Sequence, residues 1–264
     1  MRTLSASQLN VLLAEPSAVQ RKIITQQLTD EGVTSIDGVR SIKDALASIS
    51  SIRPDLIISA LHFSDGNADD FLEALRADPS WIDIPFMLIS SETRHEQLDT
   101  FKQSGVIAIL PKPFTREGIR SAINATLDLL STSELDLQCY DPDTLKVLVV
   151  DDSKMARKMI TRVLKNLGIE NITHAEDGAA AIEILHDETF DLIVTDYNMP
   201  EINGLQLAEY IRDNALLTHI PVLMVTSEAS HTHLSNVAQS GVNAMLDKPF
   251  EPELVKKLLN RLLE

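Results

Sequence analysis

The sequence is poor in cysteine, in basic residues and in long apolar runs, and each shortage excludes a class of protein. Cys139 is the only cysteine among the 264 residues, so no disulfide can form within the chain, which suits a reducing cytoplasm. Apolar runs such as Val147–Val150 are far shorter than the ~20 residues needed to cross a bilayer. We therefore expect a cytoplasmic protein without membrane insertion.

Basic residues are outnumbered, with 23 Lys and Arg against 39 Asp and Glu, and the formal net charge is −16. Acidic residues are in excess in both halves of the chain, so neither half offers a basic face for phosphate groups. We expect no direct binding to nucleic acid. The proportions of hydrophobic (44%) and charged (23%) residues are typical of a globular protein, and the length allows two ordinary domains.

The chain contains an internal repeat with one constant offset. Asp55-Leu56-Ile57 recurs 136 positions later as Asp191-Leu192-Ile193, and Lys112-Pro113-Phe114 recurs at the same offset as Lys248-Pro249-Phe250. Because one offset holds from one end of the repeat to the other, the sequence indicates a tandem pair of homologous domains. We place the first domain at residues 1–130, a linker at 131–145 and the second domain at 146–264.

Strand-like and helix-like segments alternate along each copy. In the second copy, continuous apolar runs predict strands at 146–150, 192–195, 222–226 and 244–246, and a weaker signal predicts one near 171–175. Helical periodicity predicts helices at 155–167, 178–186, 204–213, 230–240 and 252–263, the first of them ended by Gly168. This order predicts the α/β class, with two tandem doubly wound, flavodoxin-like domains, each with a parallel five-stranded sheet.

Polar side chains end the predicted strands of the second copy. The carboxyl ends of parallel strands share one edge of the sheet, where such folds bind ligands. Two carboxylates ~4 Å apart repel by about 4 kcal/mol at an effective dielectric near 20, so this edge needs a cation, and oxygen ligands favour Mg²⁺. A carboxylate beside Mg²⁺, an ammonium and a hydroxyl can attack an activated phosphoryl group. The residues are Asp151, Asp152, Asp196, Asn198, Thr226 and Lys248. Alternatively, Asp152 could simply cap the following helix.

The second copy resembles the receiver (CheY-like) domains of two-component response regulators. The resemblance rests on Val-Leu-Val-Val-Asp-Asp-Ser from residue 147, Leu-Ile-Val-Thr-Asp-Tyr-Asn-Met-Pro-Glu-Ile-Asn-Gly from 192, Met-Val-Thr-Ser-Glu from 224 and Asp-Lys-Pro-Phe from 247. It implies a bacterial protein that receives phosphate from a histidine kinase or histidine phosphotransfer protein.

The resemblance also implies a role for each residue. Asp196 would be the phosphoacceptor, and Thr226 and Lys248 would contact the phosphoryl group, with a cis peptide bond between Lys248 and Pro249. Mg²⁺ would be held by Asp151, Asp152 and Asp196 and by the backbone carbonyl of Asn198. Met245 departs from the family pattern, because an aromatic switch residue is common at that position.

The first copy keeps the framework but lacks this chemistry. Glu15-Pro16 stands in place of the two adjacent aspartates, Ala60 in place of the phosphoacceptor and His62 in place of Asn198. Ser90 and Lys112 remain. We therefore interpret the first copy as a degenerate receiver and expect an ion pair between Lys112 and Glu15.

Three functions remain open. The first is a response regulator without a separate output domain, in which phosphorylation switches the binding of an unknown protein partner through residues 230–240, 244–246 and 252–263, the face that the family commonly uses. The first copy would then dock a partner, form a homodimer or restrain the second copy.

The second candidate function is that of a phosphate sink or phosphorelay intermediate. The third, a haloacid-dehalogenase-type phosphatase, fits less well because that family expects Asp-x-Asp after the first strand. We expect no enzymatic activity beyond self-phosphorylation and autodephosphorylation.

Isolated reactive residues suggest no further site. His231 and His233 are two positions apart at the start of a predicted helix and so point in different directions. His62 is a lone histidine, and we interpret Cys139 as an inert thiol in the linker.

Overall fold

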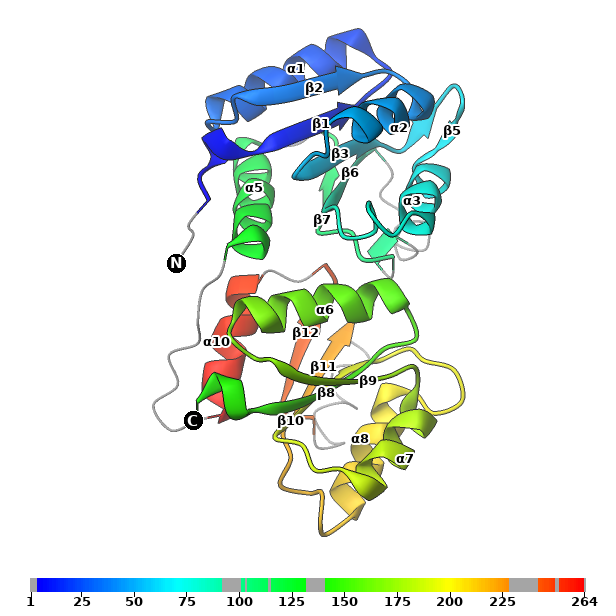
Figure 1. Ribbon diagram of the computed structural model, residues 1–264, viewed down its shortest axis with the longest axis vertical. Coiled ribbons are helices and arrows are strands. Elements are labelled where there is room, and N and C mark those ends of the chain that lie inside the picture. Colours follow the sequence, from blue (N-terminus) through cyan, green and yellow to red (C-terminus); the bar gives the residue numbers. More distant parts are fainter. Residues whose placement is uncertain are drawn as a thin grey trace. The chain divides into compact units, whose positions relative to one another are not determined.

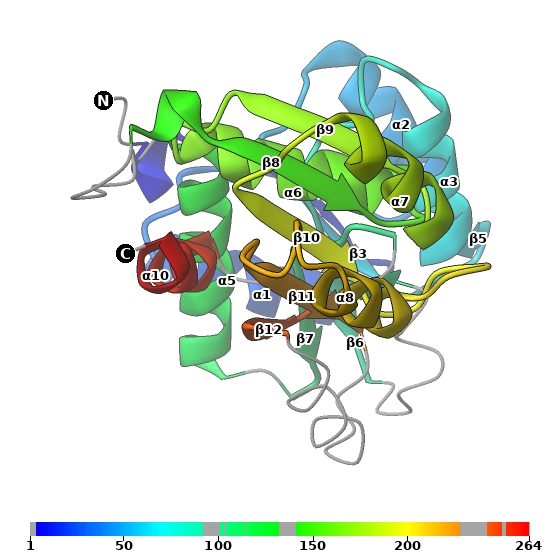
Figure 2. The same cartoon turned by 90° about the horizontal axis from the view of Figure 1, so that it is seen from below.

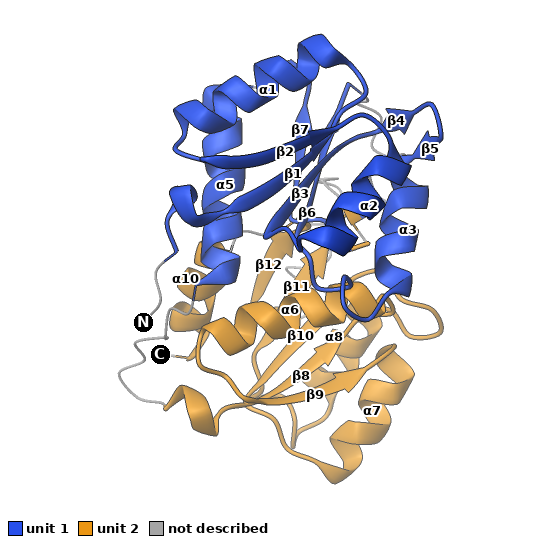
Figure 3. Cartoon of the chain, turned by 45° about the horizontal axis from the view of Figure 1, so that its top comes forward, with its two compact units in different colours: residues 1–101, 105–131 blue, residues 102–104, 132–264 orange. Residues whose placement is uncertain are grey.

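Two structural units divide the chain. The computed structural model describes residues 4–91, 101–102, 104–113, 115–131, 141–227, 242–249 and 252–263. Unit 1 consists of residues 1–101 and 105–131, and unit 2 consists of residues 102–104 and 132–264 (Figure 3). Most of the predicted linker lies outside the described residues.

Each unit is built around a parallel five-stranded sheet (Figure 1). The elements of unit 1 are β1 (Asn10–Ala14), α1 (Ala18–Asp30), β2 (Ser35–Val39), α2 (Ile42–Ser51), β3 (Leu56–Ala60), β4 (His62–Phe63), β5 (Gly66–Asn67), α3 (Ala68–Ala77), β6 (Phe86–Ser90), β7 (Ala108–Pro111) and α5 (Arg116–Leu130). Those of unit 2 are β8 (Lys146–Val150), α6 (Lys154–Asn166), β9 (Asn171–Ala175), α7 (Gly178–Asp187), β10 (Leu192–Asp196), α8 (Gly204–Asp213), β11 (Val222–Thr226), β12 (Ala244–Asp247) and α10 (Pro252–Leu263).

The strand order is the same in both sheets. It is β2-β1-β3-β6-β7 in unit 1, and β9-β8-β10-β11-β12 in unit 2. The register is also repeated, since Val11 pairs with Leu56 as Val147 pairs with Leu192. The predicted fold class is confirmed. The short antiparallel pair β4–β5 was not predicted, and it occurs only in unit 1 within the described ranges.

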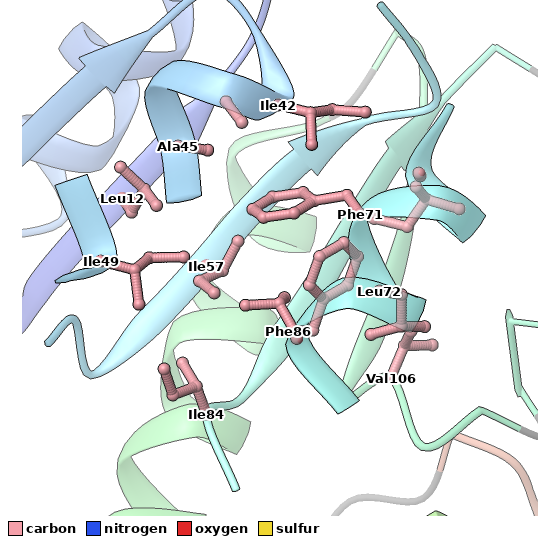
Figure 4. Packing of buried hydrophobic residues seen from close by; sticks show 14 of the residues in the cluster. Leu12, Ile42, Ala45, Ile49, Ile57, Phe71, Leu72, Ile84, Phe86 and Val106 are labelled. Carbon is pink, nitrogen blue, oxygen red and sulfur yellow. The ribbon is translucent and has the colours of Figure 1, made fainter. Parts of the chain in front are cut away.

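Helices cover both faces of each sheet, which explains the continuous apolar strands. Every residue of β3, β6, β10 and β11 is buried, as expected for parallel strands packed on two sides. In unit 1, α2 and α3 pack on one face, where the rings of Phe71 and Phe86 meet edge to face with centroids 5.7 Å apart (Figure 4). In unit 2, α7 and α8 lie next to each other, away from α10 (Figure 2).

Local signals fix where the first helix of each unit begins and ends. The Ser17 hydroxyl accepts a hydrogen bond from the Gln20 amide, and the Ser153 hydroxyl accepts one from the Ala156 amide. Ser153, rather than Asp152, is therefore the cap of α6. Gly168 follows that helix at a φ of +92°, a conformation that glycine adopts without strain, as the sequence predicted. No helix in the described ranges is long and apolar enough to span a membrane.

Candidate phosphoacceptor site

The strand order of unit 2 brings two aspartates together. Asp151 directly follows β8, Asp196 ends β10, and these two strands are neighbours in the sheet. The chain order reverses here, which in such sheets is where ligands bind. Both residues are buried, with exposed fractions of 0% and 2%. The sheet therefore holds two carboxylates away from water at its carboxyl edge.

Lys248 connects these two carboxylates. Its Nζ lies 2.7 Å from Asp151 Oδ2 and 2.7 Å from Asp196 Oδ1. Each aspartate also accepts a backbone amide two residues further on, because Ser153 N donates to Asp151 Oδ1 (2.8 Å) and Asn198 N donates to Asp196 Oδ2 (3.0 Å). All four carboxylate oxygens are thus oriented by specific donors.

The cluster carries more negative than positive charge. Burial raises the pKa of Asp196 to about 6, even though Lys248 acts in the opposite direction. Burial likewise raises the pKa of Asp151. For Lys248, burial alone would lower the pKa, but the two carboxylates raise it above its usual value. Two buried carboxylates against one ammonium leave a net negative site that would gain from a further cation.

Thr226 and Asn198 also lie at this edge. Thr226 ends β11 and is buried, and its carbonyl accepts a hydrogen bond from Lys248 N at 2.6 Å. The Lys248–Pro249 peptide bond is cis, as the resemblance implied, and the equivalent Lys112–Pro113 bond is cis as well. Met245 lies half-buried in β12 opposite Met224 of β11.

The donor set fits a hard divalent cation in its chemistry. Asp151 and Asp196 supply carboxylate oxygens, and the Asn198 carbonyl lies two residues beyond Asp196. Asp152 is exposed, and the structure does not gather it with the other two aspartates into one group. Among the described residues, no three His, Cys, Asp or Glu side chains are close enough together to hold a metal ion. The fit therefore rests on the excess negative charge of the buried pair.

Sequence reasoning missed two residues that support this site. Gly204 begins α8 directly against the Asp196 carbonyl, and a Cβ on Gly204 would lie only 2.0 Å from that oxygen. The Arg157 guanidinium donates a hydrogen bond to the Asp151 carbonyl. A signal for Arg157 was present in the repeat, since Arg21 occupies the same place and donates to the Glu15 carbonyl.

Unit 1 holds a smaller cluster at the equivalent edge. Lys112 Nζ lies 3.0 Å from Glu15 Oε2, so the predicted ion pair is confirmed. Ala60 takes the place of the second carboxylate and is buried, as is Ser90. His62 is exposed and pairs with Asn67 in the β4–β5 ladder. This edge contains one carboxylate and one ammonium, so its charges balance.

Other residues singled out from the sequence lie outside the described residues. They are Cys139, His231, His233 and the predicted helix at 230–240.

Comparison with known proteins agrees with these features. The response regulator receiver domain family matches twice, at residues 11–124 and 147–260. Chemotaxis protein CheY of Pseudomonas aeruginosa is 40% identical over 120 residues, which cover 46% of this chain and 97% of that protein. CheY-3 of Vibrio cholerae is 39% identical over 120 residues, with coverages of 46% and 92%.

A solved structure of Vibrio cholerae CheY4 shares 34% identity and covers 45% of this chain and 98% of that one, with a TM-score of 0.43. Receiver domains act in two-component signalling, generally bind Mg²⁺ for phosphorylation and interact with histidine kinases or phosphotransfer proteins. The two family matches together span most of the residues, and the two matched segments form parallel sheets with the same strand order. This chain belongs to the response regulator receiver domain family, with two receivers in tandem.

Proposed function

We propose that unit 2 accepts a phosphoryl group on Asp196 from a histidine kinase or phosphotransfer protein, and that this event changes its binding to a protein partner. The observation that supports the proposal is the buried Asp151–Lys248–Asp196 cluster with its uncompensated negative charge. An uncompensated buried charge reduces stability, and groups of this kind are concentrated at functional sites.

The proposed transfer forms an acyl phosphate. One Asp196 oxygen attacks phosphorus, the bond from phosphorus to the donor nitrogen breaks, and the nitrogen keeps the electron pair. Lys248 already lies against Asp196 and offsets charge on the transferred oxygens, while the Thr226 hydroxyl contacts the phosphoryl group. Asp151, Asp196 and the Asn198 carbonyl would hold Mg²⁺, which when bound supplies further positive charge at this edge.

Unit 1 has a different role in this proposal. Ala60 offers no nucleophile, and the balanced Lys112–Glu15 pair creates no demand for a cation. We therefore assign unit 1 as a degenerate receiver that serves protein contacts, by docking a partner, forming a dimer or restraining unit 2. In this proposal the chain has no external substrate and turns over only its own acyl phosphate.

Intact mass measurement after incubation with Mg²⁺ and acetyl phosphate tests this function. The full chain should gain a single phosphoryl adduct, and the Asp196→Ala chain should gain none, although its unit 1 is unchanged. Asp187→Asn, which removes an exposed carboxylate at the end of α7, is the matched control and should behave as wild type. An adduct that persists in Asp196→Ala would refute the assignment.

Two further measurements separate the other functions. Rapid return of the phosphoryl group from Asp196 to a histidine phosphotransfer protein, with no change in elution or partner binding, would favour the phosphate sink or relay. Steady release of phosphate from a phosphomonoester by the purified protein would favour the phosphatase.

A further inference from the structure

The loop between β10 and α8 carries Asn198 and is held by a close contact with the start of α7. Gly178, the first residue of α7, donates its amide to the Ile202 carbonyl at 3.1 Å. A Cβ on Gly178 would lie 2.5 Å from that carbonyl oxygen and 2.6 Å from Ile202 Cγ2. Real Cβ atoms do not approach other atoms so closely, so any larger residue at position 178 must move the loop backbone.

Unit 1 makes the same contact with the two residue types exchanged. Ile42 begins α2 at the position of Gly178, and Gly66 occupies the loop position of Ile202, each one repeat earlier. A Cβ on Gly66 would lie 3.0 Å from Ile42 Cδ1. The large side chain thus comes from the helix in unit 1 and from the loop in unit 2.

The loop conformation changes together with this exchange. In unit 1 the Ile42 amide donates to the Asp65 carboxylate (3.2 Å) rather than to a loop carbonyl, and the loop forms the β4–β5 pair. His62, at the position of Asn198, lies in that pair. In unit 2 the Asn198 amide is instead bound to Asp196.

We propose that Gly178 is a positioning residue. By leaving room for Ile202, it holds the β10–α8 loop in the conformation that keeps Asn198 beside Asp196. A large residue at the helix position with glycine in the loop, as in unit 1, favours the loop conformation of unit 1 instead. This inference rests on the proposed phosphorylation of Asp196.

The loop has little freedom to absorb a shift at Ile202. At one end Asn198 is bound to Asp196, and at the other Gly204 packs directly against the Asp196 carbonyl. A displacement at Ile202 is therefore transmitted towards Asn198. Misplacement of a reacting group by about 1 Å can slow a reaction by about 10²-fold.

The rate of adduct formation with acetyl phosphate and Mg²⁺, per folded molecule, tests the proposal in four full-length proteins. Gly178→Ala should be slower than wild type by about 10- to 100-fold. The exchanged variant, Gly178→Ile with Ile202→Gly, refills the contact as in unit 1 and should recover thermal stability while its rate stays low. Leu185→Ala, which removes a buried side chain elsewhere on α7, should lose stability and keep the wild-type rate.

The outcomes separate this inference from the proposed function. If wild type forms no adduct, the proposed function fails. If wild type reacts and Gly178→Ala reacts equally fast, only the positioning role is overturned. Recovery of both stability and rate in the exchanged variant would also overturn it, because a purely structural contact predicts that result. Should the exchanged variant not fold, the rates of Gly178→Ala and Leu185→Ala decide the question.

Discussion

The two units share one backbone plan but differ at the edge where phosphorylation is proposed. β1 and β8, and each later pair of strands, start one repeat length apart, and both sheets have the same order. Yet unit 1 contains a neutral Lys112–Glu15 pair, whereas unit 2 contains two carboxylates around Lys248. The same fold forms with either arrangement. The acidic cluster is therefore not what stabilises the fold, and a functional explanation is the better one.

The difference extends to solvent access. The Lys112 side chain is 23% exposed, against 3% for Lys248. If the lysine is removed, water can therefore hydrate the carboxylate that is left unpaired in unit 1, but it cannot reach the two carboxylates in unit 2. This contrast leads to three predictions, which begin with the largest expected effect.

Removing the lysine should damage unit 2 much more than unit 1. Lys248→Met leaves two buried carboxylates without a cation and should lower the free energy of unfolding by about 3–5 kcal/mol near neutral pH. Lys112→Met leaves one carboxylate beside a partly open position and should cost about 1 kcal/mol. Urea unfolding without metal measures both, with Trp81, the single tryptophan, reporting on unit 1 and circular dichroism on the whole chain. Equal losses of unfolding free energy in Lys248→Met and Lys112→Met would contradict this difference between the two units.

Asp196→Ala, which places in unit 2 the residue that unit 1 has, should stabilise the metal-free protein. Folded Asp196 holds its proton up to about pH 6, whereas in the unfolded chain its ordinary pKa is 3.8. The folded state therefore binds more protons, and stability falls as the pH rises through this window. The variant should lose that part of the pH dependence and gain about 1–3 kcal/mol above pH 6.

Urea unfolding at a series of pH values between about 4 and 8 measures this effect. Asp187→Asn, which removes an exposed carboxylate, is the control and should keep the wild-type dependence of unfolding free energy on pH. If the free energy of unfolding of Asp196→Ala depends on pH as in wild type, the folded protein does not raise the pKa of Asp196, and the prediction is wrong.

Mg²⁺ should stabilise unit 2 alone. At ten times the dissociation constant, a ligand that binds only the folded state adds about 1.4 kcal/mol. The unfolding transition of unit 2 should shift by this amount, and the Trp81 transition of unit 1 should not move. Loss of the shift in Asp151→Asn would locate the binding at the acidic edge. A shift of the Trp81 transition that equals the shift of unit 2 would contradict the assignment of unit 1 as degenerate.

Much of the fold and site could be predicted from the sequence because the signals are local or are repeated. Apolar runs predicted β8 and β11 to the residue and gave a weaker signal near β9, and the repeat indicated the same order of elements in unit 1. Asp151, Asp196 and Lys248 could be placed at one edge because each occurs at a strand end, and parallel strands share their carboxyl edge. The Lys112–Glu15 pair followed from the same reasoning.

Contacts that depend on how the loops at the strand ends fold back on themselves could not be predicted in this way. Nothing in the local sequence shows that Gly204 packs against the Asp196 carbonyl, or that Arg157 donates to the carbonyl of Asp151. The β4–β5 pair has only two residues in each strand, too few for a periodic signal. The exposure of Asp152, beside a buried Asp151, also depends on how the chain turns into α6.

The sequence by itself therefore determined the tandem organisation, the class of fold and the residues that end each strand, because these follow from periodicity, repetition and chain order. Only the tertiary structure decided how those side chains share charge, and which residue of the Gly178–Ile202 contact, or of its reversed counterpart Ile42–Gly66, fills the space beside the loop. The physical reason is that burial and close packing are properties of atoms brought together from separate segments, and no single segment contains them.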